Sequence, residues 1–96
     1  MTGTSYAMAW REDTGPRVVG KVELADDAVV LEATVPPGSE QRVPFGQIVD
    51  TALLGGVLRV DHEVGVLLIR TLDAGGALRE LAERIETAVA SAHARS

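Results

Sequence analysis

The stretch that decides the fold is DAGGALRELAERIETAVASAHA, residues 73–94. Its apolar side chains recur at helical spacing; they are Leu78, Leu81, Ala82, Ile85, Ala88, Val89 and Ala92. The opposite side is charged and carries Arg79, Glu80, Glu83, Arg84 and Glu86. This pattern predicts one amphipathic helix with a buried face. It begins at the N-cap residue Asp73 or, because glycine weakens a first turn, at Gly76 or Ala77.

Residues 17–72 alternate between apolar and polar positions and predict a β meander. The first pair of strands is Val18–Leu24 and Val29–Val35, joined by the turn Ala25–Ala28. One register keeps apolar residues opposite apolar residues, because it pairs Leu24 with Val29 and Val22 with Leu31. The same register places Lys21 opposite Glu32 on the outer face.

A second group of strands follows the loop Pro36–Ser39. The segment Gln41–Leu54 is expected to be extended and to bend near Gly46, and Pro44 restricts its first half to a sheet edge or a bulge. Its core candidates are Val43, Phe45, Ile48 and Val49. After the turn Gly55–Gly56, Leu58 and Val60 point inward and Arg59 and Asp61 outward. A turn at His62–Gly65 and the strand Val66–Thr71 complete the meander.

The chain is expected to form a single domain, residues 1–96, in which residues 1–16 are a poorly defined N-terminal segment, residues 17–72 the β meander and residues 73–94 the helix. Within the first segment, Ser5–Arg11 is interpreted as an edge strand whose Trp10 packs into the core. The predicted fold class is mostly β: an antiparallel bent barrel or sandwich of about five to seven strands, capped by a C-terminal helix.

Composition excludes several functions. The formal net charge of -5 disfavours a nucleic-acid-binding protein, which normally presents a basic face. Without cysteine there is no disulfide, thiolate metal site or cysteine nucleophile, which fits a reducing compartment. Neither a signal peptide at Met1–Trp10 nor a membrane-spanning apolar run is recognisable, so a cytoplasmic location is expected.

No residues assemble a catalytic, cofactor or metal site, so we expect no enzyme and no cofactor. Asp61, His62 and Glu63 lack a second convergent histidine and are interpreted as a solvent-facing turn without metal. Asp26 and Asp27 lack the spacing of a calcium loop. The pairs Gly55–Gly56 and Gly75–Gly76 match no phosphate-binding motif. The serines have no nucleophile-elbow context; they are Ser5, Ser39, Ser91 and Ser96.

The last strand is apolar on both faces, because Val66 and Leu68 alternate with Leu67 and Ile69. Val19 and Val30 add apolar side chains to the outer faces of the first hairpin. A strand that is apolar on both sides is covered on both sides. The cover is either the C-terminal helix or another protein subunit.

The spacing of these segments resembles that of small bacterial pleckstrin-homology-like domains. The resemblance covers roughly residues 17–92 and rests on strand, turn and helix placement, from Gly20–Leu24 through Arg42–Val49 and Gly65–Ile69 to the helix. It implies a bent barrel with a helix at one open end. Phosphoinositide-binding members carry basic residues around the first hairpin loop, whereas this loop is the acidic Ala25–Ala28. Anionic membranes are therefore not expected as partners.

We expect a non-enzymatic protein-interaction or self-association module, an adaptor-like domain that binds another protein or forms a homodimer. The alternative is a module that binds a small hydrophobic ligand or lipid in a cavity between the sheet and the helix. A barrel filled mostly by Val, Leu and Ala, with one Phe, leaves room for that alternative.

Overall fold

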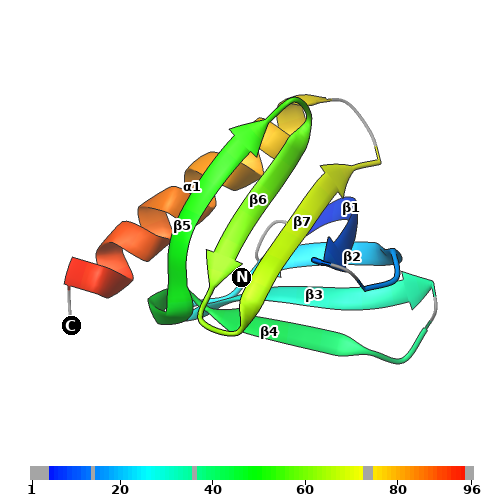
Figure 1. Ribbon diagram of the computed structural model, residues 1–96, viewed down its shortest axis with the longest axis horizontal. Helices are drawn as coiled ribbons and strands as arrows, with labels where there is room; N and C mark the ends of the chain where they lie inside the picture. Colours follow the sequence, from blue (N-terminus) through cyan, green and yellow to red (C-terminus); the bar gives the residue numbers. More distant parts are fainter. Residues whose placement is uncertain (1–4, 14, 36, 73–74, 95–96) are drawn as a thin grey trace.

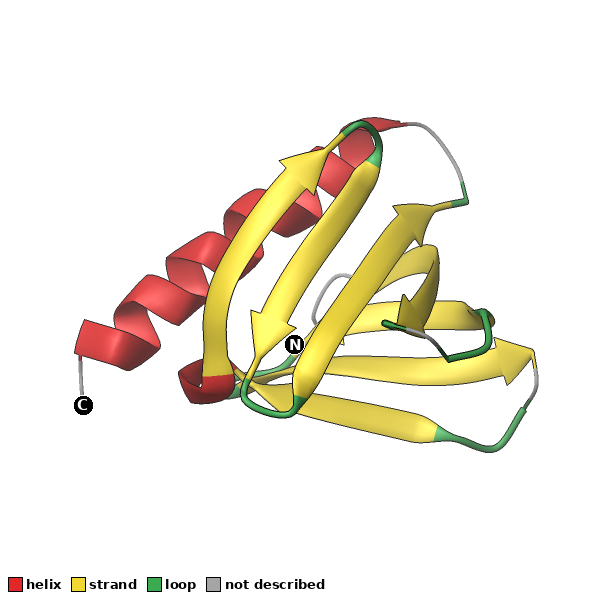
Figure 2. Ribbon diagram, viewed as in Figure 1, coloured by secondary structure: helices red, strands yellow, loops and turns green. Residues whose placement is uncertain are grey.

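The computed structural model describes residues 5–13, 15–35, 37–72 and 75–94 (Figure 1). Strands precede a single long helix, and a short 3-10 helix, η1, interrupts them (Figure 2). The elements in chain order are β1 (Ser5–Glu12), β2 (Val18–Leu24), β3 (Ala28–Val35), β4 (Glu40–Pro44), η1 (Phe45–Gln47), β5 (Ile48–Leu54), β6 (Val57–His62), β7 (Gly65–Thr71) and α1 (Gly75–Ala94). The predicted class, an antiparallel β domain capped by a C-terminal helix, is confirmed.

The seven strands form one antiparallel sheet in the order β4-β3-β2-β1-β7-β6-β5, which is bent but not closed. Its two edges, β4 and β5, are consecutive in the chain and are joined by η1. Backbone hydrogen bonds fix this corner, because Phe45 donates to the Asp27 carbonyl at 2.9 Å and Glu63 donates to the Gln47 carbonyl at 3.1 Å. The edges therefore meet at η1 without pairing.

The N-terminal strand β1 lies near the centre of the sheet, so its interpretation as an edge strand was wrong. β1 pairs with β2 on one side, where Ala9 faces Val19, and with β7 on the other. The sequence pattern of this strand is short and mixed, and its partner β7 lies far away in the chain. Local pattern carries no information about such pairing, although the expected burial of Trp10 is confirmed at 5% exposure.

The first hairpin has the predicted register. Leu24 pairs with Val29 and Val22 with Leu31, and both Val22 and Leu31 are fully buried. Lys21 lies opposite Glu32, and their side chains form an ion pair at 3.4 Å. Burial of one face fixes this register, because a shift by one residue would move the charged pair into the core.

The bend predicted near Gly46 is η1, which lies between the edge strand β4 and the edge strand β5. Val43, Phe45 and Ile48 are buried, as expected. Val49 is not a core residue, because its side chain is 67% exposed. The 3-10 turn resets the alternation of the chain, so Ile48 points inward and its neighbour points outward.

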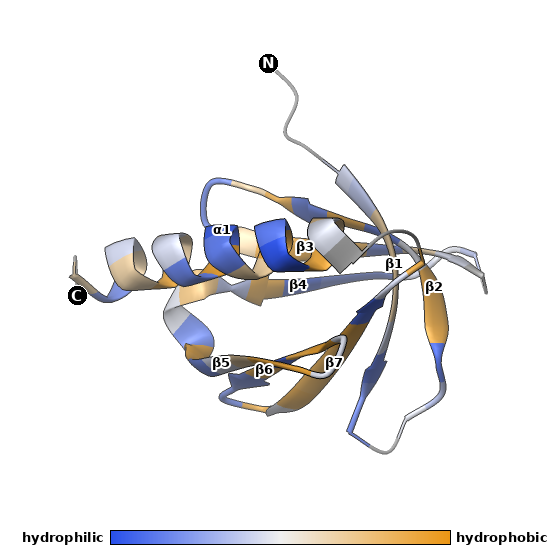
Figure 3. Ribbon diagram, turned by 90° about the horizontal axis from the view of Figure 1, so that it is seen from above, coloured by the Kyte–Doolittle hydropathy of each residue, from blue (hydrophilic) through white to orange (hydrophobic). Residues whose placement is uncertain are grey.

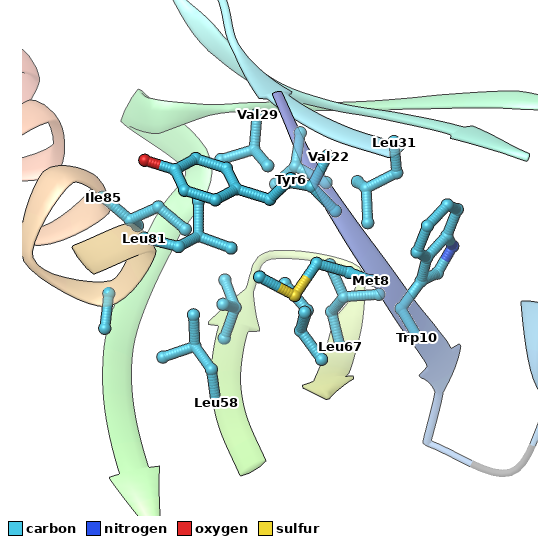
Figure 4. Packing of buried hydrophobic residues seen from close by; sticks show 14 of the residues in the cluster. Tyr6, Met8, Trp10, Val22, Val29, Leu31, Leu58, Leu67, Leu81 and Ile85 are labelled. Carbon is cyan, nitrogen blue, oxygen red and sulfur yellow. The ribbon is translucent and has the colours of Figure 1, made fainter. Parts of the chain in front are cut away.

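Helix α1 lies on the inner side of the sheet and contacts η1, β5, β6 and β7. Figure 3 shows it running alongside the layer formed by those three strands. The predicted apolar stripe is confirmed, because Leu78, Leu81, Ala82 and Ile85 are buried in the same core as the inner residues of the strands. In Figure 4 Leu81 and Ile85 point from the helix toward Tyr6, beside Met8 of the central strand. The predicted N-cap, Asp73, lies outside the described residues.

The two faces of β7 therefore have different surroundings. Leu67 and Ile69 point inward to the core and to the helix, and at most 1% of either residue is exposed. Val66 and Leu68 point to the outer face and are half-buried. Because the helix packs on the inner side, it does not cover the outer face of this strand. Among the described residues, no helix is both long enough and apolar enough to cross a membrane.

Candidate functional site

A hollow of about 360 Å³ lies on the outer face of the sheet, where β1, β7 and β6 run side by side (Figure 1). We call it the arginine hollow. Its lining residues come from these strands and from the turn after β1: Ala9, Trp10, Arg11, Gly15, Arg17, Val57, Leu68 and Arg70. Three arginines and several apolar residues thus line the same hollow.

Strand register explains how the arginines and the apolar side chains alternate. Leu68 of β7 lies opposite Arg11 of β1 on one side and opposite Arg59 of β6 on the other. One position along, Arg70 of β7 lies opposite Ala9 of β1. On the outer face, each of these cross-strand pairs thus sets an arginine beside an apolar residue. The pattern repeats because side chains on one face of a strand recur at every second position.

No described residue neutralises the charges of the arginines that line the hollow. Among the described residues, the other basic side chains of the sheet have acidic partners: Lys21 with Glu32, Arg42 with Asp27 and Arg59 with Asp61. Arg11, Arg17 and Arg70 form no ion pair or side-chain hydrogen bond with any described residue. The chain has a net charge of -5, yet three exposed arginines line one hollow without a carboxylate bonded to them among the described residues. This is an unusual distribution of charge.

The turn that carries Gly15 and Arg17 is fastened to the sheet. Gly15 donates to the Glu12 carbonyl at 2.7 Å, and Asp13 donates to the Val66 carbonyl of β7 at 2.9 Å. The Glu12 carboxylate points to the inner side, where it accepts a hydrogen bond from the Gln41 side chain. These bonds hold the turn against β7.

The placement of His62 corrects the sequence interpretation. Asp61, His62 and Glu63 are not all in a solvent-facing turn, because His62 is the last residue of β6 and is only 7% exposed. Its Nε2 lies 3.7 Å from a carboxylate oxygen of Glu12 and has no hydrogen-bond partner among the described residues. Asp61 pairs instead with Arg59 at 3.4 Å, and Glu63 is exposed. The three side chains diverge, as strand alternation predicts.

The other motifs occupy turns. Asp27 forms an exposed ion pair with Arg42 at 2.9 Å. Gly55 and Gly56 have φ angles of 54° and 83°, in the left-handed region that a glycine turn supplies. Across the described residues, no group of three or more His, Asp or Glu side chains is arranged to hold a metal ion.

The space between the sheet and the helix is occupied by side chains. Leu58, Leu81 and Ile85 are all fully buried there. A second hollow of about 460 Å³ lies outside this core, between Leu24 of β2 and residues of α1. This second hollow is lined by Glu83 and Arg84, which carry opposite charges. The charged residues that line the arginine hollow, in contrast, are all positive.

The sequence analysis missed the arginine hollow because its residues are far apart in the chain. It correctly placed Arg59 on the outer face, but it left open which side chains of the last strand point outward and it treated β1 as an edge strand. The pairing of β1 with β7 brings Arg11 and Arg70 to either side of Leu68. One usable signal was present: Leu68 lies two residues before Arg70, and therefore on the same face, of a strand that is apolar on both faces.

The hollow presents cationic and apolar groups. Its lining side chains include no carboxylate, imidazole, hydroxyl or thiol, so they supply neither a general base nor a nucleophile. Guanidinium groups bind carboxylates and phosphates through paired N–H donors. The apolar lining residues offer apolar contact beside them.

No known protein family matches the chain, and no curated protein matches its sequence. Among solved structures, the chain is similar to the C-terminal domain of an unknown protein from Leishmania infantum. The TM-score is 0.66 and the sequence identity 13%, and the similarity covers 88% of this chain and 84% of the other. This likeness shows the fold of a small antiparallel β domain with a C-terminal helix.

Proposed function

We propose that this protein is a non-enzymatic interaction module, an adaptor-like domain whose partner docks on the outer face of β1, β7 and β6. The observation that carries the proposal is the arginine hollow. Arg11, Arg17 and Arg70 line it together with apolar residues and have no ionic partner among the described residues. Interfaces are enriched in arginine and place apolar contacts at their centre.

The surroundings of Leu68 support a protein partner. Leu68 is only half-buried although it lies on a strand near the middle of the sheet, and the helix packs on the other side. An apolar residue between two arginine-bearing strands gains free energy when a partner removes it from water. The arginines then set the orientation and the rate of association.

The strand and helix pattern supports a pleckstrin-homology-like module as the finer description of the fold, and a cytoplasmic domain fits the absence of cysteine from the sequence. Fold alone does not determine function, so the proposal rests on the outer face. The partner is another protein, or a second copy of this chain in a homodimer. Light scattering at micromolar concentration separates these two forms.

Site-specific photo-crosslinking tests the proposal. A photoreactive residue in place of Leu68 is expected to trap a defined protein partner in the cells that produce this chain. The matched control places the same residue at Glu86, which is exposed on the helix away from the sheet. If position 68 gives no product beyond that of position 86, and the protein is a monomer at every concentration, the outer face is not an interaction surface.

A further inference from the structure

We propose that the partner presents an acidic peptide segment, in which carboxylates flank an apolar side chain. The carboxylates bind Arg11, Arg17 and Arg70, and the apolar side chain lies on Leu68 and Val57. This inference rests on the proposed function, because it names the chemistry that the same face recognises.

The arginines select the charge of the partner. All three arginines are exposed and line one hollow, and none of them is bonded to an acidic side chain among the described residues. An arginine that is already paired must lose one carboxylate to gain another, as Arg59 would with Asp61. Arg11, Arg17 and Arg70 have no internal carboxylate to exchange among the described residues, so a partner carboxylate displaces only water when it forms a charge-assisted hydrogen bond.

The apolar lining residues select an apolar group beside the charges. Ala9, which is 1% exposed, and the half-buried Val57 and Leu68 line the hollow. A volume of about 360 Å³ is at the lower end of ligand sites. It suits one or two side chains of a peptide that runs across the strands, and an extended polymer would lie mostly outside it.

The rest of the surface disfavours extended polyanions. Asp50 and Asp61 lie opposite each other on β5 and β6, next to the arginine-bearing strands. The hairpin loop with Asp26 and Asp27 adds exposed acidic groups. A membrane or a nucleic acid would bring its phosphates near these carboxylates within a Debye length of about 8 Å. A short acidic peptide can instead place its carboxylates at the arginine hollow, away from these acidic side chains.

Fluorescence anisotropy with a labelled peptide tests the inference. The probe is the peptide DELLED, and its uncharged counterpart NQLLQN is the control ligand. We expect the wild-type protein to bind DELLED with affinity that falls as salt rises, and to bind NQLLQN at least about tenfold more weakly. Arg70→Gln and Arg11→Gln are each expected to weaken DELLED binding about tenfold or more. Arg70→Lys is expected to lie between these values, since lysine keeps the charge but not the paired donors.

Arg79→Gln is the matched control variant, because Arg79 is also exposed and unpaired among the described residues but lies on the helix. It should leave the Kd for DELLED within about twofold of wild type. Equal binding of the two peptides, or equal loss in Arg79→Gln and Arg70→Gln, overturns the inference, since either result shows that the hollow does not recognise the acidic probe.

Other occupants give different results. Binding to phosphatidylinositol-phosphate vesicles that Arg70→Gln abolishes would replace the peptide by a lipid headgroup. A dimer that Leu68→Glu dissociates would replace it by a second copy of this chain. If DELLED fails to bind but crosslinking from position 68 still traps a partner, the peptide chemistry is wrong and the interaction surface stands. If crosslinking fails but the arginine variants lose peptide binding, the site stands and the adaptor role fails.

Discussion

Leu68 of β7 lies directly opposite Arg11 of β1, on the face of the sheet that the helix does not cover. This pair joins residues that are far apart in the chain and sets an apolar side chain beside a cation without an acidic partner. It explains why β7 is apolar on both faces. Its inner residues pack in the core, and its outer residues are partly exposed and belong to the face that we propose as the interaction surface.

Adjacent residues of β7 are expected to respond differently to truncation. Leu67→Ala removes a side chain that is 1% exposed and should lower the free energy of unfolding by about 2–5 kcal/mol. Leu68→Ala should lower it by less, since the Leu68 side chain is only partly buried in the folded protein. Urea denaturation measures both. Equal losses would show that the outer face is covered within the monomer.

The helix is expected to be an integral part of the fold. Ile85→Ala should lower the free energy of unfolding by about 2–5 kcal/mol, because Ile85 is fully buried in the core. The neighbouring substitution Glu86→Ala, at an exposed position, should change it by no more than about 0.5 kcal/mol. A parental denaturation midpoint and slope for Ile85→Ala would contradict the docking of the helix.

Gly20 is expected to tolerate no side chain. It lies at a β-bulge of β2, and a Cβ atom there would meet the Glu32 carbonyl oxygen and lie 2.9 Å from the Thr34 nitrogen. Gly20→Ala must therefore push β2 and β3 apart, at a cost of about 1–3 kcal/mol. Gly46→Ala is the control, because a Cβ atom there meets nothing within 4 Å. Thermal melting compares the two, and similar midpoints would refute the close strand approach.

Tyr6 is expected to link stability to alkaline pH. Burial, followed by the hydrogen bond that its hydroxyl donates to Glu80 at 2.5 Å, raises the pKa of Tyr6 above its ordinary value of 10.0. The folded protein thus holds this proton more tightly than the unfolded chain. The resulting stability is fully present below pH 10.0 and is lost as the pH rises through the pKa of the folded state.

Two measurements check this. Tyr6 is the only tyrosine, so the absorbance of phenolate reports its titration alone, and it should appear above pH 10.0. Tyr6→Phe should lower the free energy of unfolding near neutral pH by about 1–3 kcal/mol and reduce its alkaline decline. Titration at the ordinary pKa would contradict both the burial of the Tyr6 phenol and its bond to Glu80.

The periodicity of apolar residues in the sequence predicted most of the local structure. The hairpin register around Lys21 and Glu32, the bend at Gly46 and the helical stripe through Leu81 and Ile85 were all predicted, because each follows from contacts between near neighbours in the chain. Val49 was misplaced because η1 resets the alternation of the strand. His62 was assigned to a turn because its polarity suggested exposure, whereas the strand continues through it.

Long-range pairing could not be predicted in the same way. Nothing in the residues near Ser5–Glu12 specifies that this strand lies between β2 and β7. The arginine hollow depends on that pairing, because Arg11 reaches Leu68 only when β1 is central. The site therefore emerges from topology, and its arginines appear in the sequence as isolated surface charges.

The most direct test of the central claim is an NMR titration of the wild-type protein with the DELLED peptide. The claim predicts that amide signals of Arg11, Gly15, Leu68 and Arg70 shift progressively, while those of the exposed helix face, such as Arg79 and Glu86, stay in place. Shifts confined to the helix, or no shifts at any peptide concentration up to the millimolar range, would contradict the assignment of the outer face of β1, β7 and β6 as the binding surface.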